Sequence, residues 1–372
     1  MEHYQQIALY GFAGAFLFGA IGSRTQFCTM GAVSDWVNMG SLTRMRVWFL
    51  ATGIAIFGAQ GLQHFGLVDL SQSIYLTTNF TWLGHLLGGF LFGIGMTLGS
   101  GCGQRTLVRV GGGNLKSLVV LLVMAISAYM TLRGLFALLR LQINDPSTID
   151  LQKSGLETQG IPELTSHFLG ISPGIATAVI AVLIGGGMIV WALRDRDVRT
   201  NFDNMLAGIG IGLIIIFAWY TTGFLGFDDF DPLPTEAYSF IAPVGNALTY
   251  LMTFTGSTIN FGISVVLGVL AGSFAYSIVS GNFRVESFSD KSDLINHLMG
   301  GLLMGFGGVM SLGCTIGQGI SGLSTLAIGS LITLVSIIAG CAFALKMQYY
   351  LYDEQGWWHA FKSTLADARP GK

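Results

Sequence analysis

The chain has 372 residues, of which 52% are hydrophobic and only 10% are charged. Soluble domains carry about 25% charged residues, so this chain cannot cover a water-facing surface. This composition, with a net charge of −2, excludes an ordinary soluble enzyme, a nucleic-acid-binding protein and a disordered protein. The 53 glycines, about twice the average usage, indicate closely packed or broken helices.

Membrane-spanning helices need roughly 20 apolar residues, and runs of that kind follow one another along the chain. In chain order they are 4–23, 47–63, 70–104 (interrupted by His85), 116–141 (with Arg133 and Arg140 near its end), 168–193, 204–227, 237–283 and 298–345. Each of the last two runs is long enough for two segments. We therefore expect an all-α polytopic membrane protein with about eight to eleven membrane-inserted segments.

Polar connections between these runs are few, and they divide the chain. The segment 144–167 is polar, 227–235 is acidic, and 194–199 (RDRDVR) has three arginines in six residues. The positive-inside rule places the arginine-rich loop in the cytoplasm. We expect a first half at 1–142, connecting helices and polar loops at 143–235, a second half at 236–350 and a C-terminal tail at 351–372.

An internal repeat is the most informative pattern. Residues 85–102 (HLLGGFLFGIGMTLGSGC) and 297–314 (HLMGGLLMGFGGVMSLGC) are identical at nine of 18 positions, at a constant offset of 212. The apolar helix of each copy, 86–98 or 298–310, would be about 20 Å long, whereas the hydrocarbon core is about 30 Å thick. We therefore expect an inverted repeat of re-entrant half-helices that meet near the membrane centre. Sharp turns at the membrane surface are the alternative, but these turns lack the acids, prolines and lysines of the outer loops.

Glycine-rich turns carry three of the four cysteines. Cys102 follows the first half-helix in GSGCGQ, Cys314 follows the second in SLGCTIGQG, and Cys28 lies in GSRTQFCTMG. Cys341 lies in a plain apolar stretch, where we expect a packing residue. Three interpretations of the other cysteines remain open. They pack as small hydrophobes, they hold a soft metal such as copper or zinc without local ligand-pair spacing, or they form a pathway for a soft sulfur-containing anion.

The pathway interpretation has a physical basis. Thiols are weak donors, so several of them can pass an anion without trapping it. Glycine turns expose backbone N–H groups, and helix N-termini add partial positive charge. The candidate substrate-binding residues are Cys28, Cys102, Cys314, Arg24, Gly101, Gly103, Gln104, Arg105, Gly313, Thr315 and Gln318. We expect no metal and no cofactor, and the sequence has no GxxxxGK[ST] loop for ATP.

The stretches GSRTQFC, GSGCGQRTLVRVGGGN and LGCTIGQGISG, in this order, resemble the YeeE/YedE membrane proteins, a sulfur-transport family that takes up thiosulfate. The resemblance covers nearly the whole chain. It implies an hourglass-shaped inverted repeat in the bacterial inner membrane, with two opposed re-entrant regions at a narrow centre. It also implies that thiosulfate passes by hydrogen bonds to three cysteines, here Cys28, Cys102 and Cys314, and that a cytoplasmic TusA-like sulfur carrier is a partner. The chain departs from the family pattern GCTxGHG at Gln318, which keeps a donor but puts proton exchange there in doubt.

We therefore predict a transporter, and not an enzyme, for thiosulfate or a related small sulfur anion, with lipid around it and no nucleic-acid partner. A membrane protein that transfers thiols or sulfur by redox chemistry is an alternative, although no CxxC or local Cys–His pair supports it. A transporter of another sulfur or selenium species and a passive scaffold in a membrane complex are further alternatives.

Overall fold

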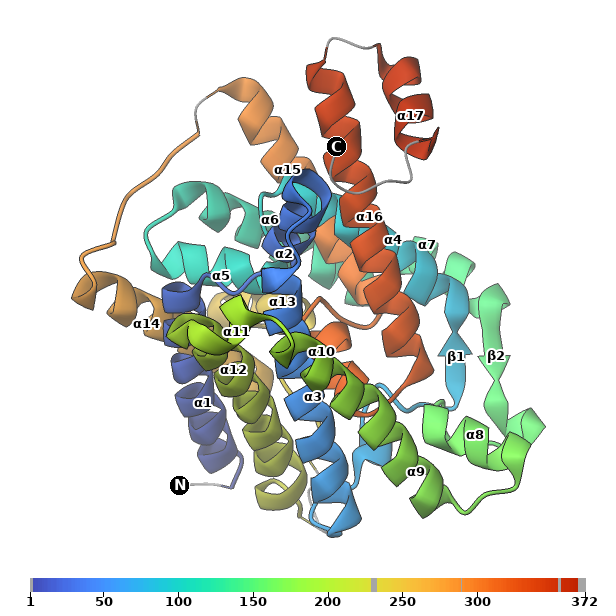
Figure 1. Cartoon of the computed structure of the whole chain (residues 1–372). Coiled ribbons are helices and arrows are strands. Elements are labelled where there is room, and N and C mark those ends of the chain that lie inside the picture. Colours follow the sequence, from blue (N-terminus) through green and yellow to red (C-terminus); the bar gives the residue numbers. More distant parts are fainter. Residues whose placement is uncertain (1–2, 229–232, 289, 354–355, 367–372) are drawn as a thin grey trace.

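Helices make up nearly all of the regular structure, as the apolar runs predict. The computed structural model describes residues 3–228, 233–288, 290–353 and 356–366 (Figure 1). Residues 229–232 of the predicted acidic loop, and residues 354–355 and 367–372 of the predicted C-terminal tail, lie outside the described residues.

The elements follow one another in a mostly helical order. The α-helices are α1 (His3–Thr25), α2 (Thr29–Met39), α3 (Thr43–His64), α4 (Trp82–Leu98), α5 (Gly103–Gly111), α6 (Leu115–Arg133), α7 (Leu135–Asn144), α8 (Ile161–Leu169), α9 (Pro173–Ala181), α10 (Gly187–Leu193), α11 (Arg196–Thr200), α12 (Phe202–Tyr220), α13 (Ala242–Met252), α14 (Phe261–Val279), α15 (Lys291–Met310), α16 (Ile328–Tyr352) and α17 (Trp357–Ala366). Short 3₁₀ segments are η1 (Leu70–Gln72), η2 (Asp145–Ser147), η3 (Leu151–Ser154) and η6 (Phe254–Gly256), and wider π-helical segments are η4 (Val182–Gly186), η5 (Thr221–Leu225) and η7 (Gly317–Gly322). The strands β1 (Asn79–Thr81) and β2 (Thr148–Asp150) pair antiparallel, with Phe80 opposite Ile149.

Eight helical segments of the described residues are long and apolar enough to cross a membrane. They are His3–Met39, Thr43–His64, Trp82–Gly111, Leu115–Arg133, Pro173–Leu193, Phe202–Leu225, Phe261–Val279 and Ile328–Tyr352. The prediction of an all-α, multi-pass membrane protein is therefore confirmed. The uncharged run 237–283 holds only one of these spans, because α13 has 11 residues and is about 16 Å long.

The helices α4 and α15 end where the repeat predicts, at Leu98 and Met310, but both begin earlier than expected. Asp290 caps α15 by accepting a hydrogen bond from the backbone N–H of Asp293 at 2.7 Å. The helix therefore includes a polar first turn and has 20 residues, about 30 Å. The charged residues of this turn made the helix look shorter in the sequence, so its length alone does not make it a half-helix.

Glycines let α4 and α15 cross at close range. A Cβ atom added at Gly307 would lie 2.6 Å from the carbonyl oxygen of Gly88, and one added at Gly95 would lie 2.9 Å from the carbonyl oxygen of Gly300. At the offset of 212, Gly88 corresponds to Gly300 and Gly95 corresponds to Gly307. The contacts are thus reciprocal between the two copies, which is the pattern expected of elements related by a two-fold axis.

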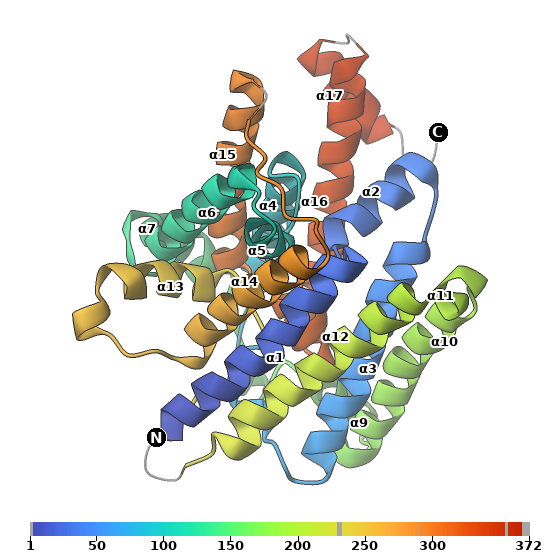
Figure 2. The ribbon, with the colours of Figure 1, turned by 90° about the vertical axis from the view of Figure 1, so that its left-hand side faces the viewer.

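Two ion pairs connect helices at one end of the bundle. Figure 2 shows the N-terminus at the lower end of α1 and the helix α17 at the opposite end of the molecule. At the end where α1 meets α2, Arg24 pairs with Asp203 at 2.8 Å and Arg46 pairs with Asp195. These ion pairs place the predicted arginine-rich loop beside the turn that carries Cys28.

Candidate functional site

Three turns that share one backbone feature carry Cys28, Cys102 and Cys314. Cys28 and Cys102 are the capping residues at the N-termini of α2 and α5, and Cys314 precedes η7 by three positions. Two positions before each cysteine is a non-glycine residue with a positive φ angle: Gln26 (56°), Ser100 (55°) and Leu312 (62°). In the described residues only Leu326 shares this property. A positive φ is unfavourable for such residues and often accompanies functional sites, so all three turns form one structural class, although only two of them share sequence.

The three turns come together inside the bundle. The thiols of Cys28 and Cys102 interact with each other. Cys102 also lies near the hydroxyl of Thr315, which has no hydrogen-bond partner among the described residues. Thr315 is the chain neighbour of Cys314, so the three turns form a series that runs from Cys28 through Cys102 to the turn of Cys314.

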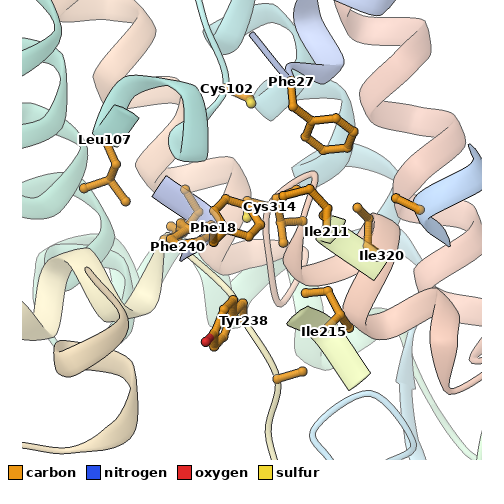
Figure 3. Close-up of a cluster of buried hydrophobic side chains, with 14 of the residues drawn as sticks. Phe18, Phe27, Cys102, Leu107, Ile211, Ile215, Tyr238, Phe240, Cys314 and Ile320 are labelled. Atoms are coloured by element: carbon orange, nitrogen blue, oxygen red, sulfur yellow. The ribbon is translucent and has the colours of Figure 1, made fainter. Parts of the chain in front are cut away.

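Burial differs along this series. Cys102 and Cys314 are 0% exposed, whereas Cys28 is partly exposed. Figure 3 shows Cys102 and Cys314 inside the apolar cluster that also contains Phe18, Phe27 and Phe240. Cys102 and Cys314 are therefore shielded from solvent in this structure, whereas Cys28 is not fully shielded.

Backbone N–H groups at helix starts face two of the thiols. The N–H of Gly31 donates to Sγ of Cys28 at 3.5 Å, and the N–H of Gly317 donates to Sγ of Cys314 at 3.3 Å. Cys102 instead donates its S–H to Oε1 of Gln104 at 3.5 Å. Helix N-termini carry partial positive charge, so these turns offer an anion both weak donors and a favourable potential.

Side chains of α5 attach this helix to the Cys28 turn. Gln104 donates from Nε2 to the carbonyl oxygen of Phe27 at 3.1 Å, and Arg105 donates from Nη2 to Oε1 of Gln26. The charge of Arg105 acts on both Cys28 and Cys102. Of the two arginines predicted for the site, Arg105 is therefore brought to the thiols.

Arg24 has a different environment. Its guanidinium forms an ion pair with Asp203 and lies over the ring of Phe202, 5.2 Å from the centroid. Its side chain is 44% exposed. The structure thus uses Arg24 to join α1 to α12 at the surface, and it does not bring this arginine to the three thiols.

The predicted glycines fit closely around the turns. A Cβ atom added at Gly313 would lie 3.0 Å from Cγ of Gln318. One added at Gly103 would lie 3.1 Å from Cδ1 of Ile241, and one added at Gly101 would lie 3.2 Å from Cγ of Arg105. Each larger residue would therefore push against a neighbour that shapes the site.

Gln318 stabilises the turn that carries Cys314. Its Nε2 donates to the carbonyl oxygen of Ser311 at 2.6 Å, and its Oε1 accepts a hydrogen bond from the hydroxyl of Ser330 at 2.6 Å. One N–H of its amide remains for another partner. The structure therefore gives Gln318 a positioning role in addition to the donor role that the sequence predicts.

Two loops distant in sequence complete the surroundings of Cys314. A Cβ atom at Gly317 would lie 2.6 Å from the hydroxyl oxygen of Ser239 and 3.5 Å from that of Tyr75. Ser321 donates its hydroxyl to the carbonyl oxygen of Tyr238 at 2.8 Å. No pattern in the sequence predicts these loop residues, because no local motif marks which loop folds over the turn.

Metal ligands do not gather here: in the part of the chain that the structure describes, no group of three or more His, Cys, Asp and Glu residues could hold a metal ion. All four cysteines are free thiols.

Comparisons with known proteins agree with the geometry of the site. The model of the sulphur transport family matches residues 24–343, which include all three cysteine turns. The chain belongs to the sulphur transport family. This result confirms the resemblance drawn from the three motifs, and the match extends over both halves of the chain.

Two curated relatives of this family are similar over most of their length. A thiosulfate transporter (TsuA) of Spirochaeta thermophila is 26% identical over 336 residues, which cover 89% of this chain and 96% of the relative. A thiosulfate transporter (TsuA) of Escherichia coli is 27% identical over 350 residues, which cover 90% and 92%. Both are transporters, so the prediction of a transport protein and not an enzyme is confirmed.

Proposed function

We propose that this protein is a permease for thiosulfate or a related small sulfur anion in the bacterial inner membrane. The substrate passes by hydrogen bonds to Cys314, Cys102 and Cys28. The observation that carries the proposal is the series of three turns, each of which has a residue with a positive φ angle two positions before a thiol that lies at or just before a helical segment. Two relatives that are thiosulfate transporters support the choice of substrate.

The three thiols are suited to pass an anion onward and not to bind it tightly. Thiols are weak donors, and permeation requires several weak sites in sequence. Arg105 supplies the fixed positive charge beside Cys28 and Cys102, whereas Cys314 is surrounded by neutral hydroxyl and amide groups. An anion would therefore move towards the end that carries the arginines.

The arrangement of charges supports one orientation. At the end where Cys28 lies, Arg46 pairs with Asp195 of the arginine-rich segment, and Arg24 pairs with Asp203, which follows that segment at the start of α12. The positive-inside rule assigns that end to the cytoplasm. In this orientation a cytoplasmic sulfur carrier of the TusA type would receive the anion near Cys28, and lipid would surround the eight spanning segments.

A transport assay tests the proposal. Protein in liposomes should take up ³⁵S-labelled thiosulfate, and Cys102→Ala should lower the rate at least about tenfold, because a donor lost from a desolvated site costs about 1.4 kcal/mol or more. Cys341→Ala is the matched control, since Cys341 is also fully buried but lies in α16 against Thr97. If the wild-type protein takes up no thiosulfate, the substrate is wrong. If Cys102→Ala transports as fast as the wild type, the thiol pathway is wrong.

The contact between the thiols of Cys28 and Cys102 favours one alternative, a sulfur-transferring redox protein. That function requires a covalent sulfur adduct on one of the two cysteines. Mass spectrometry of protein incubated with thiosulfate distinguishes the functions, because a hydrogen-bonded pathway leaves both thiols unmodified.

A further inference from the structure

A cavity lies beside the Cys28 and Cys102 turns, at the arginine-rich end of the molecule. Its volume is about 530 Å³, and it forms where the end of α1, the helix α5 and the end of α14 meet. Among the residues that line it are Ser23, Gln26, Arg105, Arg109, Arg284 and Glu286. Only Arg105 of these belongs to the predicted site, so the cavity extends beyond it.

Positive charge dominates this cavity. Three arginines line it, against one carboxylate among the described lining residues, and that carboxylate accepts a hydrogen bond from the side chain of Asn114. Arg109 donates from Nη1 to the carbonyl oxygen of Ser100 at 3.0 Å. Arg284 has no hydrogen bond or ion pair from its side chain to any described residue. Each guanidinium carries five N–H donors, so most donors in the cavity remain available to a ligand.

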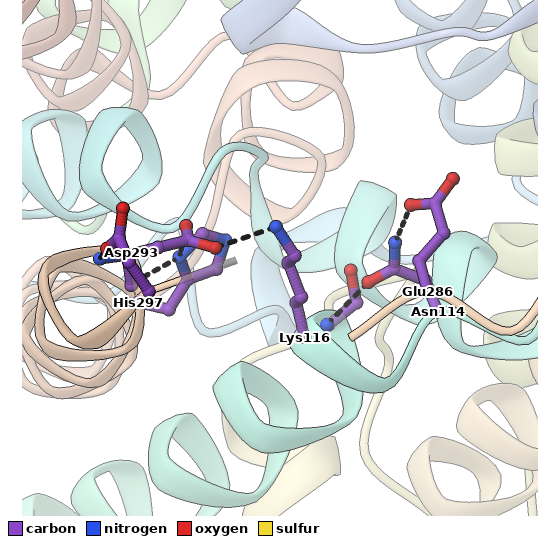
Figure 4. Close-up of polar contacts among 7 residues, drawn as sticks. Asn114, Lys116, Glu286, Asp293 and His297 are labelled. Carbon is purple, nitrogen blue, oxygen red and sulfur yellow. Dashed lines mark hydrogen bonds and ion pairs between the residues drawn. The ribbon is translucent and has the colours of Figure 1, made fainter. Parts of the chain in front are cut away.

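The wall that carries Arg284 is fixed by main-chain contacts. The N–H of Arg284 donates to the carbonyl oxygen of Gly112 at 3.1 Å, and the N–H of Leu115 donates to the carbonyl oxygen of Glu286 at 2.9 Å. Figure 4 shows the bond between Asn114 and Glu286 and, next to it, the ion pair of Lys116 with Asp293. The loop before α15 is therefore held against the start of α6, and Arg284 stays at the cavity.

We propose that this cavity is a second anion-binding site, which holds a small divalent oxyanion such as thiosulfate or sulfate between the three arginines. Guanidinium groups bind oxyanions through paired hydrogen bonds. Arg105 belongs both to this cavity and to the surroundings of Cys28 and Cys102, so the site adjoins the pathway. Arg284 is exposed, and binding at a solvated site is weak enough to permit release. This inference rests on the proposed transport of a sulfur anion and assigns to it a holding site at one end.

Membrane vesicles of both orientations, right-side-out and inverted, test the site with ³⁵S-labelled thiosulfate. We expect Arg284→Gln to raise the KM about threefold in the orientation that exposes the arginine-rich end to the medium, and to leave the KM unchanged in the other. The effect should shrink at high salt. Arg284→Lys, which keeps the charge, should recover part of the affinity. The matched control is Arg199→Gln, which removes an exposed arginine of the same end that does not line the cavity.

The outcomes separate the two proposals. Failure of the wild-type protein to transport thiosulfate in either orientation contradicts the proposed function itself. Normal transport with the same KM for Arg284→Gln and wild type in both orientations overturns only the second anion site. Because a lipid phosphate has the same charge chemistry, vesicles reconstituted from phosphatidylcholine alone are compared with vesicles that also contain phosphatidylglycerol. If Arg284→Gln raises the KM in phosphatidylcholine vesicles, the site binds a soluble anion. If the KM rises only when phosphatidylglycerol is present, the proposal of a site for a soluble anion is overturned.

Discussion

The turns at Cys102 and Cys314 have the same backbone geometry but different surroundings. Both follow a glycine-rich helix, both have a non-glycine residue with positive φ two positions earlier, and both cysteines are fully buried. After Cys102 comes the regular helix α5, which carries Arg105 and Arg109. After Cys314 comes the wider segment η7, which has no charged residue and is buried throughout.

The charges around the two turns therefore differ, although the turns share this backbone feature. The Cys102 side gathers charge in a cavity of about 530 Å³ lined by three arginines. The other end of the molecule has a cavity of about 650 Å³ whose described lining residues include Asp69 but no arginine or lysine. Positive charge is thus concentrated in the cavity beside Cys28 and Cys102.

The largest expected effect concerns the backbone symmetry. Gly88→Ala and Gly307→Ala should each lower the stability of the folded protein by about 1–3 kcal/mol, because each new Cβ atom would lie within 2.6–2.7 Å of a backbone atom of the opposite helix. The measurement is the thermal midpoint in detergent, followed by size-exclusion chromatography. Gly174→Ala is the control, since no atom lies within 4 Å of its Cβ position. An unchanged midpoint for Gly88→Ala or Gly307→Ala would contradict the close crossing of α4 and α15.

The second prediction compares the two thiols. Serine keeps a donor of similar size, so Cys102→Ser and Cys314→Ser should both retain some thiosulfate uptake. We expect Cys314→Ser to lose more, about tenfold, and Cys102→Ser about threefold, because Arg105 remains beside position 102 to attract the anion. Initial uptake rates in proteoliposomes measure the difference. Complete loss in both folded variants would instead indicate covalent sulfur chemistry, which requires a thiolate.

The third prediction concerns the glutamines that brace the turns. Gln318→Leu removes two hydrogen bonds, to Ser311 and Ser330, and should lower the free energy of unfolding by about 2 kcal/mol. Gln104→Leu removes one bond to Phe27 and the contact with the Cys102 thiol, and should cost about 1 kcal/mol. Denaturation followed by tryptophan fluorescence gives the ranking. A larger loss of unfolding free energy for Gln104→Leu would contradict this ranking, because the turn of Cys102 would then depend more on its glutamine than the turn of Cys314 does.

The sequence was sufficient to predict the broad fold. Runs of apolar residues predict the helices because a bilayer demands about 20 of them per span, and the repeated motif predicts the ends of α4 and α15. The start of α15 was missed because a capped helix can extend into charged residues beyond the apolar run.

Residues that meet across long loops could not be predicted. Tyr75 and Ser239 approach the turn after Cys314 only through tertiary packing, and Arg284 reaches its cavity through main-chain bonds to Gly112. No periodicity or spacing marks such contacts. The likeness of the Cys28 turn to the other two was hidden as well, because a positive φ angle at Gln26 leaves no signature in a non-glycine residue.

The last prediction concerns an acid near the Cys314 end. Glu236 lies outside the eight spanning segments, and burial raises the pKa of its carboxyl to about 7. Between pH 4.5 and about 7, the carboxyl of Glu236 keeps its proton in the folded protein but loses it in the unfolded chain. The free energy of unfolding therefore falls as the pH rises through this window, and this residue changes it no further above the window. Glu236→Gln should remove this contribution. The thermal midpoint of the variant, relative to the wild type, should thus be higher at pH 8 than at pH 5. A variant midpoint that differs from the wild type by the same amount at pH 8 and at pH 5 would mean that Glu236 titrates as it does in the unfolded chain.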